Sequence, residues 1–590
     1  MKKIVTILAA ALILVGKSQA QFFEETDFVG ALSSDASKDW TTGWTNWNPQ
    51  STSYPAANET TTLNGSATGK LEITTTITLD ATKVYLLKGM IVIKDGGKLV
   101  IPAGTIIRAE ADLNATPKNY ATIVVERGGK IEINGTNTKP VVITSNKAAG
   151  SRNRGDWGGI VLSGKAKNNQ SADNQVEGFN NVSFDATMAK GGGTDDADNS
   201  GSITYVRLEY GGLAFEANKE INGITFNSVG SGTKVEGIQC SYTGDDGFEW
   251  FGGTVNAKKL VAFRITDDDF DTDFGFRGAV QFGIGVKDTS QYDLTYAAPS
   301  GASTSEGFES DNDAGGSGKT PYTAAVFSNM TMVGPVKIGS TYADLPTVQK
   351  NAFRRGARIR RNTRTSIVNS VFMGYRNFIM LDGDSTLTAS GVADSTFPAT
   401  MAIQNNVFVN SAAAFSPASS TANGLVEKAG TPSLSRMDGW LKSAANKNNI
   451  NPVAYTAGTL LVDPQNATAP VFRPVTASPA NAGASFKHPR VASFGTFNSV
   501  NTLENIGTYV IYPNPSAGSL FAELELTAPE KVNVFITNLN GTVVVDAGSH
   551  SLNAGFNSIA CSTESLNNGL YLIVIAGENG KLTQKVLVQK

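Results

Sequence analysis

Histidine and cysteine are nearly absent from this sequence of 590 residues, which contains two of each. His488 and His550 both lie in the last part of the chain, beyond the repeated segments described below. Those segments therefore cannot form a Ser-His-Asp triad, a Cys-His pair or a His-ligated zinc site. Cys240 and Cys561 are far apart in sequence, which excludes a disulfide framework. We expect both to be unpaired and Cys240 to be buried, so stability must come from many paired strands or from bound metal.

Charge is also scarce, since charged residues make up 17% of the chain and the net charge is −3. This balance provides no basic surface for nucleic acid. The sequence has no Gly-x-x-x-x-Gly-Lys loop for phosphate, and we interpret its 61 glycines as corners between strands. After residue 20, no apolar run is long enough to predict a transmembrane helix.

The first twenty residues have the pattern of a secretory signal peptide. Lys2 and Lys3 precede an apolar run over 4–15, and small residues, Ser18 and Ala20, flank Gln19 before the expected cleavage. This pattern predicts a signal peptide over 1–20 and a mature chain that begins at Gln21. A retained N-terminal anchor is the alternative.

Short β-branched runs separated by Gly and Asn recur over 71–415. The run at 91–99 reappears at 123–131, an offset of 32 residues. A second run at 206–210 aligns with 238–242 and then with 261–265, at offsets of 32 and 23. A third run begins with Asn at 329, 369 and 405, at offsets of 40 and 36. Shared strands with variable loops are typical of stacked coils.

These repeats predict an all-β chain whose main domain, 71–415, is a right-handed parallel β-helix. A β-propeller is the alternative, but its period would be steadier. The matching asparagines could form a ladder of side-chain amides along the stack. Residues 21–70 would form an N-terminal cap, in which Trp40, Trp44 and Trp47 either close the open end or stack on sugars. Residues 416–507 would form an end cap and linker, with a short amphipathic helix within 432–448.

The last 80 or so residues differ in sequence pattern from the repeats and resemble a known family. They contain Tyr-Pro-Asn-Pro at 512–515, Leu-Asn-Asn-Gly-Leu-Tyr at 566–571 and a closing Lys-Val-Leu-Val at 585–588. This combination resembles the type A C-terminal sorting domain of the type IX secretion system of Bacteroidetes. The resemblance implies a small β-sandwich over 508–590 that engages the outer-membrane translocon and its shuttle protein. It also implies that the protein is secreted or displayed at the cell surface, in bacteria where this system often accompanies gliding motility.

The central part has a resemblance of its own. Gly-Asp-Trp-Gly-Gly-Ile at 155–160 and the acidic, aromatic runs at 245–253 and 267–275 look like a widespread family of secreted bacterial β-helix proteins. The stretch at 39–49 and Phe-Arg-Arg-Gly at 353–356 extend the similarity over most of 35–500. The resemblance implies a fold and a location but no established activity.

Acidic residues cluster where the second set of repeats aligns. An offset of 23 places Asp245 and Asp246 beside Asp268 and Asp269, about 4.8 Å away in the next coil. Like charges at this spacing repel, so a counter-ion is needed, and oxygen ligands with flexible geometry favour Ca²⁺ over Mg²⁺. The alternatives are a solvated acidic ridge, a salt-bridge network with arginines, or a catalytic carboxylate pair. The predicted metal ligands are Asp245, Asp246, Glu249, Asp268, Asp269, Asp271 and Asp273, with Glu306, Glu309, Asp311 and Asp313 as further candidates.

A second, weaker calcium loop is suggested by Asp196, Asp198 and Ser200. It lacks the acid expected at its twelfth position, where Arg207 stands.

Arginines cluster farther along the chain. Their planar, forked side chains suit carboxylates, phosphates or sulfates, so an anionic glycan bridged by Ca²⁺ is one interpretation. A structural network of acids and arginines is the other. The predicted ligand-binding residues are Arg354, Arg355, Arg358 and Arg360.

We interpret the whole chain as an exported, non-catalytic β-helix protein that binds a glycan or another surface ligand. A Ca²⁺-dependent polysaccharide lyase or another glycan-active enzyme, such as a glycoside hydrolase, is the first alternative. An accessory component of a gliding or nutrient-uptake complex is the second. No residue in the sequence is an unambiguous catalytic base.

Overall fold

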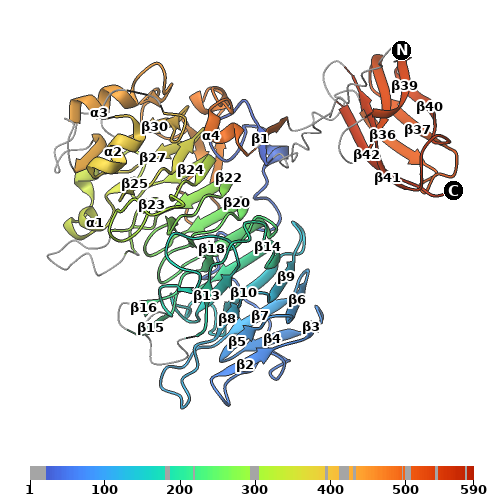
Figure 1. Ribbon diagram of the computed structural model, residues 1–590. Coiled ribbons are helices and arrows are strands. Elements are labelled where there is room, and N and C mark those ends of the chain that lie inside the picture. Colours follow the sequence, from blue (N-terminus) through green and yellow to red (C-terminus); the bar gives the residue numbers. More distant parts are fainter. Residues whose placement is uncertain are drawn as a thin grey trace, which may run out of the picture. The chain divides into compact units, whose positions relative to one another are not determined.

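The repeated runs form two long sheets of parallel strands, so the predicted parallel β-helix is confirmed (Figure 1). Ile91 pairs with Ile123, and Val371 pairs with Val407, at the offsets of 32 and 36 found in the sequence. Strands of successive coils pair in parallel, which gives the ladder of a solenoid rather than the antiparallel blades of a propeller.

The computed structural model describes residues 22–590 except 180–186, 217–218, 291, 293–303, 393–395, 397, 411–423, 430–433, 495, 499–505, 539–542 and 578–580. The predicted signal peptide lies outside the described residues. The chain divides into two compact units, residues 26–493 and residues 1–25 with 494–590. In the second unit, a short strand near the start of the described chain, β1 (Phe23–Glu25), pairs in parallel with β35 (Thr496–Asn498).

Sheet 1 has eleven strands, and it carries the acidic residues discussed below. Its order is β2 (Lys70–Ile73), β5 (Met90–Ile93), β8 (Thr122–Val125), β11 (Gly159–Ser163), β17 (Ile224–Asn227), β19 (Phe248–Phe251), β21 (Phe270–Asp273), β23 (Phe308–Ser310), β25 (Arg355–Arg360), β28 (Asn377–Asp382) and β31 (Gly424–Ala429).

Sheet 2 has sixteen strands and forms the other main wall of the solenoid. Its main path is β3 (Thr76–Thr78), β6 (Lys98–Pro102), β9 (Lys130–Asn134), β14 (Gly201–Glu209), β18 (Lys234–Ser241), β20 (Asn256–Phe263), β22 (Ala279–Val286), β24 (Val326–Val333), β27 (Val371–Met373), β30 (Val407–Val409) and β32 (Asn449–Ile450). The other strands of this sheet, which pair beside the main path, are β4 (Val84–Leu87), β7 (Ile106–Ala109), β10 (Val141–Ser145), β26 (Ser366–Val368) and β29 (Ile403–Gln404).

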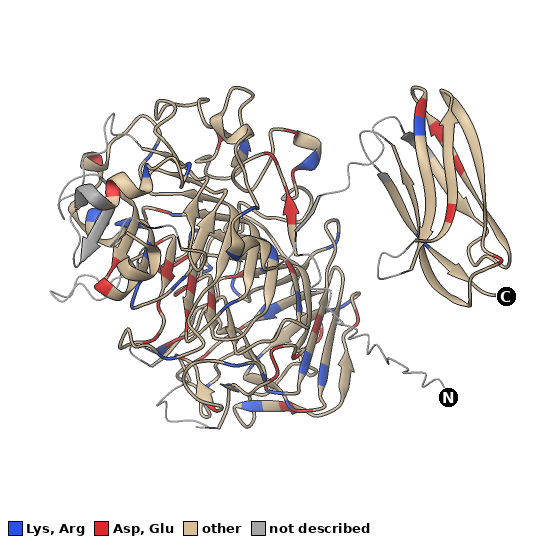
Figure 2. Cartoon of the chain, turned by 45° about the horizontal axis from the view of Figure 1, so that its top comes forward, with Lys and Arg blue, Asp and Glu red and all other residues tan. Residues whose placement is uncertain are grey.

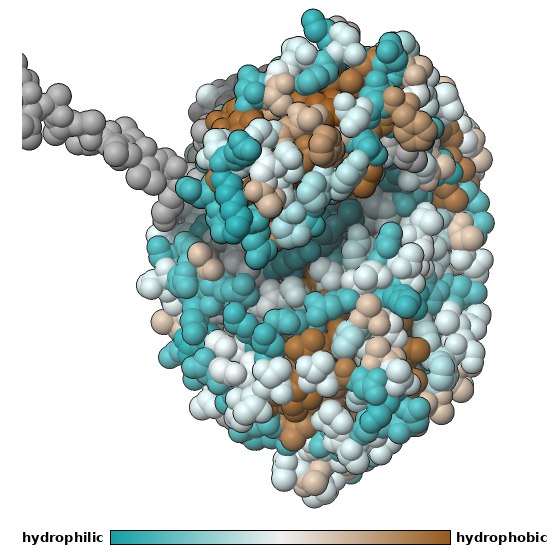
Figure 3. Space-filling model, turned by 90° about the vertical axis from the view of Figure 1, so that its right-hand side faces the viewer, coloured by the Kyte–Doolittle hydropathy of each residue, from teal (hydrophilic) through white to brown (hydrophobic). Residues whose placement is uncertain are grey.

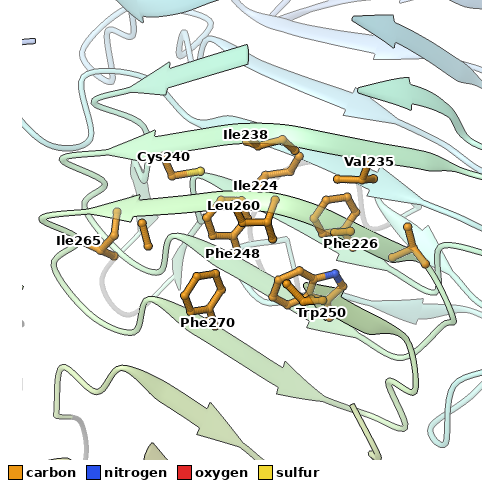
Figure 4. Packing of buried hydrophobic residues seen from close by; sticks show 14 of the residues in the cluster. Ile224, Phe226, Val235, Ile238, Cys240, Phe248, Trp250, Leu260, Ile265 and Phe270 are labelled. Carbon is orange, nitrogen blue, oxygen red and sulfur yellow. The ribbon is translucent and has the colours of Figure 1, made fainter. Parts of the chain in front are cut away.

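Side chains that point into the coils form one continuous apolar core (Figure 4). Aromatic rings from successive strands of sheet 1 stack on one another, with 5.4 Å between the rings of Phe248 and Phe270. Cys240 in β18 is fully buried among them, and neither cysteine is paired, as predicted. The core therefore relies on apolar burial and stacked rings rather than on covalent cross-links.

One residue per coil adopts a left-handed conformation in the middle of sheet 2 and bends the strand there. The three repeated asparagines, Asn329, Asn369 and Asn405, occupy this position, and Asn tolerates this conformation better than most residues. The predicted amide ladder does not link Asn329 to Asn369 directly, since Asn369 donates to the hydroxyl of Ser328. The column, with φ between 45° and 74°, comprises Tyr205, Gly237, Lys259, Phe282, Asn329, Asn369 and Asn405.

The segment 26–64 runs along the outer face of sheet 2, from its late coils back to its first. Its amides bind the hydroxyl of Thr331, the side chain of Gln239 and the carbonyl of Val84 in turn. Trp44 is fully buried in a second apolar cluster outside the coils. The tryptophans therefore cover the side of the solenoid rather than its end, which corrects the prediction that they close it. Trp44 is too deeply buried to stack on a sugar, and for the partly buried Trp40 and Trp47 such stacking stays a prediction.

Short helices and hairpins lie in the loops between the coils. The predicted helix within 432–448 is present as α3 (Leu434–Leu441). On the face in Figure 3, apolar patches alternate with hydrophilic residues. The helices in the described part of the chain are η1 (Ala36–Lys38), η3 (Tyr342–Asp344), α1 (Thr347–Ala352), α2 (Asp384–Ser390), α3, η4 (Pro479–Asn481) and α4 (Pro489–Ala492). The paired short strands are β12 (Asn174–Gln175) with β13 (Lys190–Gly191), β15 (Ala214–Glu216) with β16 (Lys219–Glu220), and β33 (Leu461–Asp463) with β34 (Val471–Pro474).

The C-terminal module is a sandwich of two antiparallel sheets around its own core, as its sequence predicts. The Tyr-Pro-Asn-Pro run begins at the last residue of the module's first strand, Tyr512, and continues into the turn before the second. No helix in the described part of the chain is long and apolar enough to cross a membrane. One sheet contains β36 (Ile506–Tyr512), β37 (Ser519–Leu526) and β40 (Gly555–Ser562). The other contains β39 (Val543–Leu552), β38 (Glu530–Thr537), β41 (Gly569–Ala576) and β42 (Lys581–Val588).

Candidate functional site

Acidic residues, red in Figure 2, occupy matching positions on neighbouring strands of sheet 1. Glu249 in β19 pairs in register with Asp271 in β21, which pairs with Glu309 in β23. The row ends at Arg358 in β25, the register partner of Glu309. The flanking Phe248, Phe270 and Phe308 point into the core, so alternation along each strand sends the charged side chains outward. We call Glu249, Asp271, Glu309 and Arg358 the charged row.

A second line of carboxylates stands at the corner just before sheet 1. Asp246 accepts a hydrogen bond from the peptide N–H of Asp268 at 2.8 Å. Asp268 accepts one from the N–H of Glu306 at 2.5 Å, and Glu306 accepts one from the N–H of Arg355 at 2.8 Å. Each carboxylate thus binds the backbone of the next coil, and we call Asp246, Asp268 and Glu306 the corner ladder. The ladder ties four coils together through charged acceptors.

The offset between these coils is 22 residues, so the predicted offset of 23 is wrong by one. Ile238 pairs with Leu260 rather than Val261, and Cys240 pairs with Ala262. Leu260 to Phe263 are all buried because the segment 26–64 covers the outer face of sheet 2. The strand therefore lacks the apolar and polar alternation that would have fixed its register. As a result, Asp246 stacks against Asp268, and Asp269 takes a different place.

Asp269 forms a separate buried ion pair with Lys287. The Lys287 Nζ lies 3.1 Å from Asp269 Oδ1, and both side chains are fully buried. Burial raises the pKa of Asp269 to about 6, while the lysine opposes that rise. Asp269 is thus separated from the other predicted metal ligands. No pattern in the sequence indicated Lys287 as its partner.

The remaining acids form three overlapping clusters in which one carboxylate oxygen of each member lies within 4.8 Å of the others. Asp246 belongs to two clusters and Asp271 to two, so the clusters form a continuous group. They are Asp245, Asp246 and Asp267; Asp246, Glu249 and Asp271; and Asp268, Asp271 and Glu309.

Burial and mutual repulsion act on these carboxyl groups in the same direction. Burial, and then the neighbouring carboxylates, raise the pKa of Asp246, Glu249, Asp268 and Asp271 well above the usual range. For Glu309, burial is again the largest cause of the raised pKa, and nearby arginines limit the rise to about 7. Asp246, Glu249, Asp268 and Asp271 therefore repel one another when they are ionised.

Three predicted acids lie beside this group rather than in it. Asp273 accepts the N–H of Phe274 at 2.6 Å, and burial followed by Asp311 raises its pKa. Asp311 pairs with arginines, as described below. Asp313 binds the N–H of Gly315 and the hydroxyl of Ser317 and so closes its own loop.

The acids of the weaker predicted calcium loop bind other groups of the protein. Asp196 pairs with Arg277 at 2.6 Å, and Asp198 accepts the N–H of Lys165 at 2.9 Å. These contacts use the carboxylates that the prediction assigned to a cation.

Three of the four predicted arginines, Arg355, Arg358 and Arg360, pair with acids. Arg355 is buried and binds Glu306 at 2.7 Å. Arg354 lies outside these pairs, and its carbonyl accepts the N–H of Asn377. The other arginines form an alternating chain, Asp382–Arg358–Glu309–Arg360–Asp311–Arg361, with contacts of 2.5 to 3.4 Å. Sequence reasoning named neither Asp382 nor its place at the end of this chain.

A cavity of about 360 Å³ opens at this alternating chain. Arg361 and Asp382, the two ends of the chain, both line it, and their side chains are 40% and 22% exposed. Arg358 belongs both to the cavity wall and to the charged row, so the cavity adjoins the acidic group. The further lining includes Gly316, Asn362 and Thr386.

Two families match the chain. The one described as a pectate-lyase like beta helix domain matches residues 71–444, and the one described as a secretion system C-terminal sorting domain matches residues 510–589. No curated protein matches the chain.

Solved structures give distant matches. The full-length tailspike protein 2 of an Escherichia coli O157:H7 bacteriophage is 11% identical, with 84% of this chain and 64% of that chain covered and a TM-score of 0.23. The chain therefore spans less than two thirds of that protein. The enzymatically active domain of tailspike protein 2 of bacteriophage CBA120 is 12% identical, with 84% and 72% covered and a TM-score of 0.20.

Proposed function

The chain belongs to the family of pectate-lyase-like β-helix domains, and on this premise we propose that it binds a glycan beside sheet 1 and holds Ca²⁺ among the acids there. Its sorting domain directs export across the outer membrane to the cell surface or the medium. The observation that carries the proposal is the cavity at the alternating chain, which adjoins a group of buried carboxylates.

The acidic group fits a hard divalent cation. Asp246, Glu249, Asp268 and Asp271 form no ion pair with Lys or Arg among the described residues. Asp271 Oδ1 is buried and has no hydrogen-bond partner there. Oxygen ligands within 4.8 Å of one another suit Ca²⁺, whose coordination tolerates irregular geometry. In this proposal the cation offsets the repulsion, and the carboxylates of the three clusters hold it.

The cavity fits a small polar ligand. Its volume is at the lower end of the range for ligand pockets, and its walls offer both guanidinium donors and carboxylate acceptors. A sugar presents hydroxyl groups that can meet both kinds of partner. The cation has a structural role in this proposal, since it fixes the charged row from which Arg358 and Glu309 extend.

Calorimetric titration of the exported protein tests both parts. We expect Ca²⁺ to bind, and we expect oligosaccharide binding to weaken in chelator because the charged row loses its cation. Asp271→Asn should reduce Ca²⁺ affinity, whereas Asp173→Asn, in an exposed pair with Arg127, should not. An absence of glycan binding with Ca²⁺ present would refute the glycan proposal, and an absence of Ca²⁺ binding would refute the metal site.

A Ca²⁺-dependent lyase is the second candidate, favoured by one observation. Arg358 follows Glu309 in the same outward row, which places a basic group one coil away from the acidic group. In a lyase the cation would acidify the proton beside a sugar carboxylate, and a base would remove it. Incubation with uronate polymers separates the candidates, because only a lyase releases unsaturated products that absorb ultraviolet light.

A further inference from the structure

We infer that the cavity at the alternating chain selects a neutral sugar unit over an acidic one, an inference that rests on the glycan-binding function proposed above. Forked arginines beside a cavity would ordinarily suggest an anionic ligand. Here the charges and contacts of the same arginines favour a different ligand class.

Each arginine of the cavity already has a carboxylate partner. Arg358 lies 3.4 Å from both Glu309 and Asp382, and Arg360 contacts Glu309 and Asp311. Arg361 binds Asp311 at 2.7 Å. An anionic ligand would have to compete with these internal carboxylates for every guanidinium group.

The charge balance of the cavity also disfavours an anion. Arg358, Arg360 and Arg361 face the lining acids Asp382 and Asp384 and the acids behind them, Glu309 and Asp311. When all four carboxylates are ionised, three guanidinium groups leave one negative charge. The acidic group of sheet 1 adds further negative charge nearby unless a cation offsets it. A second carboxylate or a sulfate would meet net repulsion here.

A neutral sugar matches the two open ends of the chain. Arg361 supplies N–H donors and Asp382 supplies acceptor oxygens, and both are more exposed than Arg358 and Arg360 inside the chain. Neighbouring sugar hydroxyls can accept from the first and donate to the second without separating any ion pair. None of the described lining residues is aromatic, so recognition depends on hydrogen bonds rather than on stacking.

Calorimetry on the full exported protein with Ca²⁺ tests this inference. The probes are hexasaccharides of glucose, mannose and galactose, compared with a galacturonate hexasaccharide. We expect at least one neutral probe to bind about tenfold more tightly than the galacturonate, the difference expected when one charged contact is lost or opposed. Tighter binding of the galacturonate would overturn the inference while leaving glycan binding intact.

Two variants locate the effect in the cavity. Asp382→Asn removes a charged acceptor and the net negative charge, so neutral binding should fall about tenfold while galacturonate binding rises. Arg361→Gln should weaken neutral binding without that rise, because it leaves the cavity more negative. Asp173→Asn is the matched control, an exposed Asp–Arg pair elsewhere, and should change neither affinity.

Thermal melting of each variant ensures that it is folded before binding is compared. Unchanged neutral affinity in both folded variants would overturn the inference. If no probe of either class binds to the wild-type protein, both the proposed glycan function and this inference fail.

Discussion

The amide of Ala31 donates a hydrogen bond of 2.8 Å to the hydroxyl of Thr331, a residue 300 positions later in the chain. The contact is buried and joins the segment 26–64 to β24 of sheet 2. Beside it, the N–H of Gly30 binds the carbonyl of Asn369, and the N–H of Val29 binds the carbonyl of Ala480. The early segment is therefore part of the solenoid's side wall and not an appendage.

Gly30→Ala should destabilise the protein because Gly30 has φ of +89° and a Cβ there would lie 2.9 Å from Thr331 Oγ1. The left-handed conformation alone costs roughly 1–2 kcal/mol for a residue with a side chain. Gly458→Ala is the matched control, since Gly458 has φ of +70° but open space around it. We expect the lower thermal midpoint in Gly30→Ala. Equal midpoints would mean that the close packing on Thr331 contributes nothing.

Ca²⁺ should raise the thermal midpoint of the wild-type protein, and chelator should lower it. A ligand held only by the native state adds RT ln(1 + [L]/Kd), roughly 2.7 kcal/mol at one hundred times Kd. Asp246→Asn and Asp271→Asn should shrink this difference and, in chelator, should melt above the wild type because they remove repulsion. Asp173→Asn should behave as the wild type. No effect of chelation would mean that the acidic group does not depend on a cation.

Without metal, stability should decrease as pH rises from about 4 to about 7. The raised pKa values of Asp269, about 6, and Glu309, about 7, mean that the native state holds these protons more tightly than the unfolded state. Stability from this source is complete below the unfolded values near 4 and is lost as pH passes through the folded values. Urea midpoints in chelator across this range measure the slope, and saturating Ca²⁺ should reduce the part of it that comes from Glu309. A midpoint that climbs with pH in chelator would contradict the assignment.

Truncation before Thr508 should leave a folded solenoid in the periplasm. The C-terminal module has its own core, so the strands of sheets 1 and 2 do not need it. Cell fractionation with an antibody to the solenoid measures the location, and a melting transition shows that the retained protein is folded. Fusion of 508–590 to a periplasmic reporter is the complementary control and should carry the reporter out. Export of the truncated protein at the full-length level would contradict the sorting role.

Much of the fold could be predicted because many strands bury one face and repeat their motifs. The pairing of Ile91 with Ile123 and of Val371 with Val407 was visible as matching runs. The pairing of Cys240 with Ala262 was not visible in the sequence. Leu260 to Phe263 are apolar on both faces of the strand, so the pattern fits either register. Both faces are buried only because the segment 26–64 lies over them. Contacts across 300 residues leave no local pattern from which that arrangement could be read.

The sequence predicted which acids form the site better than it predicted their contacts. Asp246, Glu249, Asp268 and Asp271 do come together, because their runs follow matching strands of neighbouring coils. Asp269 instead pairs with Lys287, and Arg358 pairs with Asp382, each partner coming from a different element of the coil. Lone charged residues of this kind are indistinguishable from surface charges until the coils are stacked.

The path of the segment 26–64 has a consequence for how the protein is made. A chain delivered across a membrane from its N-terminus presents these residues first, yet Val29, Gly30 and Ala31 find their partners only after Thr331, Asn369 and Ala480 have arrived. Their contacts have very high sequence separation, which slows folding. Until then, Trp44 and the apolar outer face of sheet 2 are without their native cover. Closure of this wall therefore requires delivery of nearly the whole solenoid.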